Sequence, residues 1–429
     1  MSKQKNAARL ALLIWFLTGT AVAEHPVAES QRHQQEATVA YQAGDYEGFT
    51  RSLERAHELN PASFATKYNL ACGYARTGRT DAALDLLEQL AIAQVDFGMA
   101  DDPDLASLRE LPRFKAMVDL IESSIVPISN STELLTVNQL GLWPEGIALD
   151  PDTNRLFFGS MRSGDIYVVD AERRWSKFAS VGDIGTYSAI GMTVDSDRKI
   201  LWTVGTWFFA AEGFDAENPM ASGLFGFDLT TGELRQEYLV DPSVTGLNDV
   251  AVAPNGDIYV SGSQIHVLRN GSDKLQPLPT ETESFGANGL TVDPAGTKLF
   301  ISSYPVGIGV IELDTGSLRF LDSPAERPLY GIDGLYWHEG DLVGIQNGIQ
   351  PWRLLRMRLN RDVTEVTSVE VIEFANEALT PTTGAIDGNR IIYVGQGPAP
   401  EAAPSQFPQT TRPFLGSTVI MTAPLDVDE

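Results

Sequence analysis

One phrase recurs six times in the second part of the chain, at intervals of about 50 residues. It consists of a variable residue followed in most copies by glycine, then an apolar stretch that usually ends at an aspartate, a turn, and a second apolar run. The six copies are PEGIALDPDTNRLFFGS, AIGMTVDSDRKILWTVG, LNDVAVAPNGDIYVSG, ANGLTVDPAGTKLFISS, IDGLYWHEGDLVGIQN and TTGAIDGNRIIYVGQ. Short apolar runs separated by Gly, Asp-Pro and Asn-Gly are typical of antiparallel strands joined by tight turns.

Six such units predict a mainly β fold, a six-bladed β-propeller over residues 132–425 with one four-stranded sheet per blade. The segment TELLTVN precedes the first unit. We expect it to pair with strands of the last blade, because this closes the ring and removes an open sheet edge.

Residues 30–123 have a different period and predict a small all-α domain before the propeller. Gly44 and Gly78 are separated by about 34 residues, as are Leu53 and Leu87, which is the period of a tetratricopeptide repeat. The region resembles about two such repeats and a final helix. Two interpretations stay open: a groove for a protein partner, or a helical cap on the propeller.

The first 23 residues have the three parts of a secretory signal peptide. Lys3, Lys5 and Arg9 precede a short apolar run, and Ala21-Val22-Ala23 is a small-residue cleavage site. The sequence therefore predicts a periplasmic or secreted protein without stable membrane insertion. The formal net charge of −26 argues against nucleic acid as a partner, because phosphate binding requires basic patches.

Equivalent positions at the start of each unit should form a ring around the propeller channel. These positions hold Glu145, Ile190, Asn248, Asn288, Asp333 and Thr383. Two carboxylates and two carboxamides suit a hard divalent cation, so we predict one metal ion, with Ca²⁺ favoured and Mg²⁺, Mn²⁺ or Zn²⁺ as alternatives. The competing interpretation is that these residues only cap strand ends. Asp249 is expected to orient Asn248, to bind a second ion, or to bond a turn.

These phrases resemble the regucalcin and gluconolactonase family, over residues 133–400. The resemblance implies that the Glu of P-E-G, the Asn of N-D, the Asn of N-G and the Asp of D-G hold a divalent metal. Here they are Glu145, Asn248, Asn288 and Asp333. Gly246 stands where the family has an arginine that helps to hold a sugar acid.

The predicted function is that of a metal-dependent hydrolase of a lactone or related ester. The metal would polarise the carbonyl, and Asp333 would activate water. The side chains expected to bind substrate are Trp207, Phe208, Phe209, Tyr304, Tyr330, Gln346 and Asn347. For each aromatic residue among them, packing within the fold is the competing interpretation. The rival interpretation is a non-enzymatic, metal-stabilised module for binding a protein or ligand. A third interpretation is an enzyme like strictosidine synthase, which forms a carbon–carbon bond. That chemistry would not need the four metal ligands, so their presence argues against it.

Overall fold

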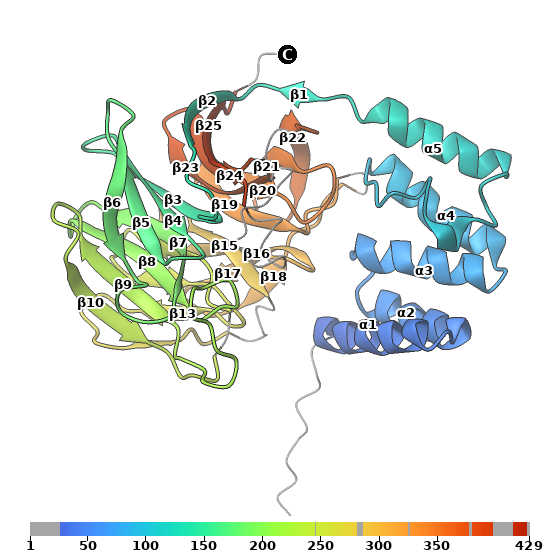
Figure 1. Ribbon diagram of the computed structural model, residues 1–429, viewed down its shortest axis with the longest axis horizontal. Helices are drawn as coiled ribbons and strands as arrows, with labels where there is room; N and C mark the ends of the chain where they lie inside the picture. The colour runs from blue at the N-terminus through green and yellow to red at the C-terminus, as the bar shows by residue number, and fades with distance from the viewer. Residues whose placement is uncertain are drawn as a thin grey trace, which may run out of the picture.

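Six β-sheets surround a central channel, and a helical array lies beside them (Figure 1). The computed structural model describes residues 26–244, 246–280, 286–324, 327–376, 380–397 and 415–426. The predicted signal peptide lies outside these ranges. Each blade is an antiparallel sheet. Its innermost strand is β3, β7, β11, β15, β19 or β23, and the following strands of the chain lie progressively farther out. The six-bladed propeller predicted from the repeat is confirmed.

The first three blades follow the chain in simple up-and-down order. Blade 1 contains β3 (Pro144–Asp150), β4 (Arg155–Ser160), β5 (Asp165–Val169) and β6 (Trp175–Ser180). Blade 2 contains β7 (Ser188–Asp195), β8 (Ile200–Thr206), β9 (Gly223–Asp228) and β10 (Leu234–Leu239). Blade 3 contains β11 (Val250–Val252), β12 (Ile258–Val260), β13 (His266–Leu268) and β14 (Leu275–Pro277).

Blade 4 also follows the chain in order, whereas blades 5 and 6 each add a strand that precedes β3 in the sequence. Blade 4 contains β15 (Ala287–Val292), β16 (Lys298–Ser303), β17 (Gly307–Glu312) and β18 (Leu318–Phe320). Blade 5 contains β19 (Ile332–His338), β20 (Asp341–Gln346), β21 (Arg353–Leu359) and β22 (Val366–Phe374), with β1 (Ile128–Ser129) at its edge. Blade 6 contains β23 (Thr380–Asp387), β24 (Arg390–Gln396), β25 (Thr418–Pro424) and β2 (Thr132–Val137).

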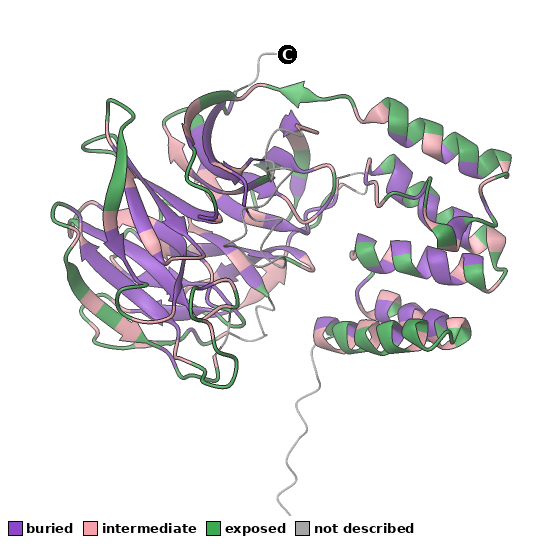
Figure 2. Ribbon diagram, in the orientation of Figure 1, coloured by how far each residue is buried: buried purple, intermediate pink, exposed green. Residues whose placement is uncertain are grey.

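Strand β2 closes the ring, as TELLTVN predicted. It pairs antiparallel with β25, from Thr132 opposite Thr422 to Val137 opposite Thr418. The second strands of the blades are deeply buried because neighbouring blades cover both of their faces, and every residue of β8 and of β20 is buried. The outermost strand β10 is mostly exposed. Figure 2 shows the same gradient, with buried strands inside the propeller.

The helical array consists of two antiparallel helix pairs and a final helix. The helices are α1 (Pro26–Gln42), α2 (Tyr46–Leu59), α3 (Phe64–Arg76), α4 (Thr80–Ile92) and α5 (Pro112–Ser124), with a 3-10 turn η1 (Pro103–Leu105) before α5. Gly44 and Gly78 occupy equivalent turns with φ of 74° and 79°, where glycine avoids left-handed strain. A tetratricopeptide identity for these pairs stays a prediction.

The core of the helical array continues into the propeller. Tyr330 and Ile349, from two propeller loops, belong to the same buried cluster as the helices. The buried guanidinium of Arg353 donates hydrogen bonds to the carbonyl oxygens of Ala93 (3.0 Å) and Gln94 (2.7 Å), just beyond α4. The array is therefore packed against the loops of blades 4 and 5, at the end of the propeller where β19 begins.

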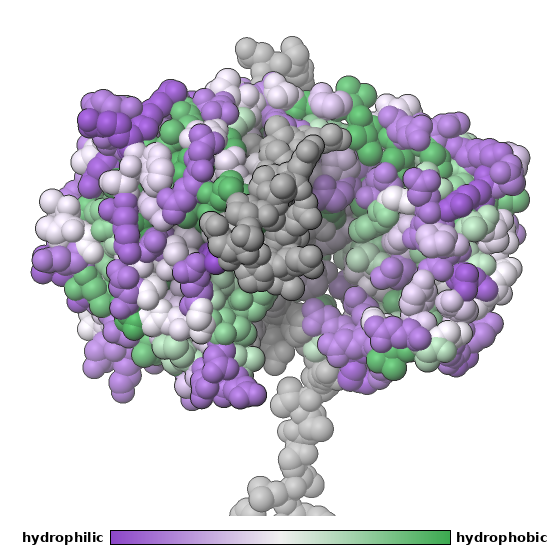
Figure 3. All heavy atoms as spheres, in the orientation of Figure 1, coloured by the Kyte–Doolittle hydropathy of each residue, from purple (hydrophilic) through white to green (hydrophobic). Residues whose placement is uncertain are grey.

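The visible surface is mostly hydrophilic with scattered apolar residues, consistent with the large negative charge (Figure 3). Among the described helices, none is long and apolar enough to cross a membrane.

Candidate metal centre

The inner strands of neighbouring blades approach each other closely at the channel, and glycines make this possible. The residue after the ring position is glycine in five of the six units. A Cβ on Gly146 would lie 1.8 Å from the carbonyl oxygen of Ile190, and one on Gly289 would lie 2.3 Å from that of Asp333. Glycine therefore recurs at this position because a side chain would collide with the backbone of the next blade. The same close backbone contact fixes the positions of the ring residues.

Blade 3 departs from this pattern, because Asp249 replaces the glycine. The facing residue of blade 2 is Gly191, where a Cβ would lie 2.5 Å from the Asp249 Oδ1. The missing side chain on Gly191 leaves room for the carboxylate. Asp249 is buried and lines a channel cavity of about 330 Å³ that runs along the inner strands away from the ring.

The ring places carboxylates together without a basic partner. Glu145 is buried, and burial raises its pKa well above the usual range, with further increases from the charges of Asp333 and Asp249. Burial also raises the pKa of Asp333, and it raises that of Asp249 to about 7. Among the described residues, no lysine or arginine forms an ion pair with any of the three carboxylates. A site of this kind is stabilised by a bound cation.

Two oxygens near these carboxylates have no hydrogen-bond partner in the described structure. They are the Oδ1 of Asn288 and the Oγ1 of Thr383, both buried. Asn288 also forms a side-chain hydrogen bond with Asp333, so its amide nitrogen points to the carboxylate while its oxygen stays available. Asn248 is half-buried and lies two residues before β11, the inner strand of blade 3. Carboxylate and carboxamide oxygens are the donors that Ca²⁺ prefers, so these residues fit a hard cation.

Asp333 is held by a short chain of polar groups from neighbouring loops. The Nδ2 of Asn347 lies 2.6 Å from Asp333 Oδ2 and also donates to the carbonyl of Pro381 at 2.9 Å. The hydroxyl of Tyr304 donates to Asn347 Oδ1 at 3.1 Å. Tyr304 and Asn347, predicted to bind substrate, thus lie beside the ring, where their observed contacts orient Asp333.

Tyr330 and Gln346 have contacts of a structural kind. The ring of Tyr330 packs against Phe64 of α3, with centroids 5.2 Å apart. Gln346 is fully buried, and its amide donates to the carbonyls of Pro328 (2.7 Å) and Tyr330 (2.8 Å). These contacts hold the loop before β19 in place, and a substrate-binding role for either residue stays a prediction.

The long β8–β9 connection forms an aromatic cluster. Trp207 packs against Phe214 with centroids 4.6 Å apart, and Phe208 against Phe209 at 4.3 Å. Phe209 also contacts Trp143 edge-on at 5.9 Å. Trp143 precedes the P-E-G phrase directly, so it connects this cluster to the strand that carries the ring glutamate.

Sequence reasoning missed two residues beside the ring, Trp143 and Tyr336. The hydroxyl of Tyr336 accepts the N–H of Gly384 at 2.5 Å, and burial together with the nearby carboxylates raises its pKa. The position of Trp143 against P-E-G was a usable signal. The sequence held no comparable signal for Tyr336, because the other repeat units do not carry a tyrosine at the equivalent position.

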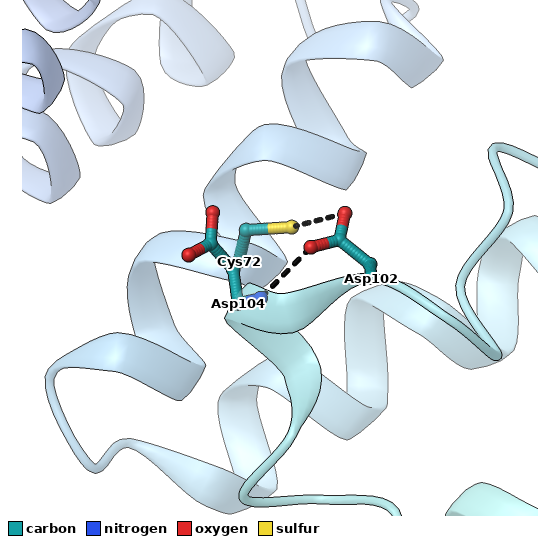
Figure 4. A group of neighbouring side chains, drawn as sticks. All are labelled: Cys72, Asp102 and Asp104. Atoms are coloured by element: carbon teal, nitrogen blue, oxygen red, sulfur yellow. Dashed lines mark hydrogen bonds between the residues drawn. The ribbon is translucent and has the colours of Figure 1, made fainter.

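A second group of possible metal ligands lies in the helical array: Cys72, Asp102 and Asp104 (Figure 4). Its groups already have partners. Asp102 accepts hydrogen bonds from the Tyr68 hydroxyl (2.7 Å) and from the backbone N–H of Asp104 (2.8 Å). Burial raises the pKa of the Cys72 thiol, which favours the protonated form that binds metals poorly. The group acts as a polar joint between α3 and η1.

The fold and the ring define the class: a six-bladed β-propeller with an oxygen-rich, negatively charged centre. Similar solved structures include a gluconolactonase from Xanthomonas campestris, with 14% identity over 68% of this chain and 89% of that chain and a TM-score of 0.45. A calcium-binding protein, regucalcin, from Agrobacterium tumefaciens has 16% identity, covers 67% and 93%, and scores 0.44. Virginiamycin B lyase from Staphylococcus aureus has 15% identity, covers 68% and 98%, and scores 0.45. No protein family and no curated protein matches the sequence.

Proposed function

We propose that the chain is an exported, divalent-metal-dependent hydrolase of a lactone or related ester. The observation that carries the proposal is the group formed by the buried Glu145 and Asp249 and the half-buried Asp333, which has no basic partner among the described residues. Grouped carboxylates with raised pKa values are more common at functional sites than elsewhere. The sequence match of Glu145, Asn248, Asn288 and Asp333 to the lactonase motif supports the same assignment.

In this mechanism Glu145, Asn248, Asn288 and Asp333 would hold the cation, with calcium favoured. A bound cation polarises an ester carbonyl and stabilises the oxyanion that develops on it. Asp333 would take a proton from the attacking water, while Asn347 keeps its carboxylate in one orientation. The aromatic cluster around Trp143 and Phe209 would give the acyl or alkyl part of the substrate an apolar wall.

The test is hydrolysis of a panel of lactones and aryl esters by the chain lacking residues 1–23. Each substrate is measured with calcium, with EDTA, and with EDTA followed by an excess of each divalent metal. The proposal expects turnover that EDTA abolishes and one metal restores. Metal-independent turnover, or none with any metal, would overturn it.

The alternative is a non-enzymatic module in which the metal only stabilises the propeller and the helical array binds a partner. Calcium that raises the melting temperature without any turnover in the same panel would support the module.

A further inference from the structure

A cavity between the helical array and the propeller lies apart from the channel ring. It has a volume of about 430 Å³, within the range of roughly 300–1000 Å³ that is common for small-molecule sites. Its described lining comes from both parts of the chain, including Phe64, Lys67 and Ile92 of the helices and Phe320, Leu329 and Tyr330 of the propeller. We call it the interdomain cavity.

The walls of the interdomain cavity are mainly apolar. Leu329 and Tyr330 are buried, and the Tyr330 ring packs against Phe64. Ile92 is 52% exposed at the end of α4, so an apolar side chain borders the opening. An apolar guest would cover surface that water now contacts, and this burial would favour binding.

Lys67 is the one charged side chain among the described residues that line the cavity. Its ammonium lies 4.7 Å from the centroid of the Phe64 ring, and burial lowers its pKa. No carboxylate lies within ion-pair distance of it among the described residues. Nearby His57 has a buried Nδ1 without a hydrogen-bond partner, and the Lys67 charge helps to keep that imidazole neutral.

The helix geometry adds to the positive character at this end of the cavity. Phe64 is the first residue of α3, a helix of 13 residues, and Ser63 caps it. The first turn of a helix presents unpaired N–H groups and a partial positive charge. Lys67 and this helix end therefore point to one kind of ligand group, an anion.

We propose that the interdomain cavity binds an amphipathic carboxylate: a medium-sized apolar body with one carboxylate. The carboxylate would pair with Lys67, and the apolar body would lie against Phe64, Leu329 and Tyr330. The protein has a net charge of −26, so non-specific attraction of an anion is disfavoured and binding requires a local cation. The proposal is independent of the proposed hydrolase.

The experiment is calorimetric titration of the chain lacking residues 1–23 with octanoate, in EDTA so that no metal binds the probe. We expect saturable 1:1 binding, which K67M weakens by roughly ten- to hundredfold, as for loss of a charged hydrogen bond. K115M is the matched control, because Lys115 is an exposed lysine of α5 paired with Glu110 and should leave affinity unchanged. Octanamide, which has the same chain without the charge, should bind the unaltered protein as weakly as octanoate binds K67M.

Shorter carboxylates test the apolar part, since affinity should fall by up to roughly fourfold for each methylene removed. Absence of saturable octanoate binding would overturn the proposal. So would equal affinity in K67M, an equal loss in K115M, or equal binding of octanamide and octanoate.

Discussion

At the scale of single residues, the channel ring combines like charges that would repel each other without a cation. Asp333 differs from the other ring residues because two asparagines bond its carboxylate and Tyr304 orients one of them. Such bonds fix one carboxylate orientation, which a general base requires. Glu145 accepts a backbone hydrogen bond from Gly146 but none from a side chain among the described residues, as suits a residue whose oxygens would face an ion.

Replacing Asp333 by Asn should lower kcat for any lactone or ester turned over by the protein by about 10²- to 10⁴-fold. The amide keeps the shape and an oxygen but cannot accept the proton. The control is Asp341→Asn on the same blade, which faces Arg356 and lies outside the ring. Full activity in the Asp333 variant would remove this residue from the mechanism.

Asp249 should make the stability of the calcium-free protein depend on pH. Its folded pKa of about 7 lies above the unfolded value of about 4, so the folded state binds the extra proton between these values. Stability is therefore lost as the pH rises from about 4 to about 7, by on the order of 4 kcal/mol.

Melting temperatures measured in EDTA at pH 5 and pH 8 check this expectation for Asp249. Asp249→Asn cannot ionise and should reduce the difference between the two temperatures. Saturating calcium should also reduce it in the unaltered protein, because the cation favours ionised carboxylates. An unchanged difference in the variant would contradict the assignment.

At the scale of elements, the glycine after the ring position is required for inner strands to meet. Gly146→Ala places a Cβ against the Ile190 carbonyl at a backbone φ of 59°. Gly388→Ala is the matched control, with a φ of 56° and no atom within 4 Å of the added Cβ. The control should cost about 1–2 kcal/mol of left-handed strain.

Gly146→Ala should cost at least about 2 kcal/mol more than the control, because overpacking adds to the strain. Urea unfolding midpoints of the two variants give the comparison. Equal midpoints would show that the blades can separate at the channel without penalty.

The repeat explains how much of this could be predicted from sequence. Positions fixed by the six-fold phrase, such as Glu145 and Asp333, could be predicted to lie on inner strands, and they lie on β3 and β19. Strand β2 could be placed because an unclosed ring leaves a free edge. The contacts of Gln346 follow no period, although it ends β20, because its partners Pro328 and Tyr330 lie in a loop, so these contacts were not predictable in the same way. The contact of Arg353 with Ala93 joins segments of different periodicity, and no pattern in either segment encodes it.

At the scale of the whole molecule, the helical array and the loops near the ring form one packed unit. Asn60, at the end of α2, donates to the carbonyl of Pro305 at 3.0 Å, next to Tyr304. The backbone N–H of Asp96 donates to Gln350, in the loop that follows Asn347. The helices therefore brace the two loops whose side chains orient Asp333.

Arg353 makes two of the hydrogen bonds between the helices and the propeller from a buried side chain, and Arg353→Met tests its contribution. The change keeps most of the apolar stem but leaves the carbonyls of Ala93 and Gln94 without their donor, at about 1–3 kcal/mol for each unsatisfied group. We expect calorimetry to show the helices unfolding before the propeller, as a separate transition. Arg358→Met is the control, because Arg358 lies on the same strand with a side chain 45% exposed and pairs with Asp341. A single transition at the original temperature in Arg353→Met would mean that Arg353 is not needed to hold the helices, and that the apolar packing of Phe64, Tyr330 and Ile349 with the remaining hydrogen bonds is enough.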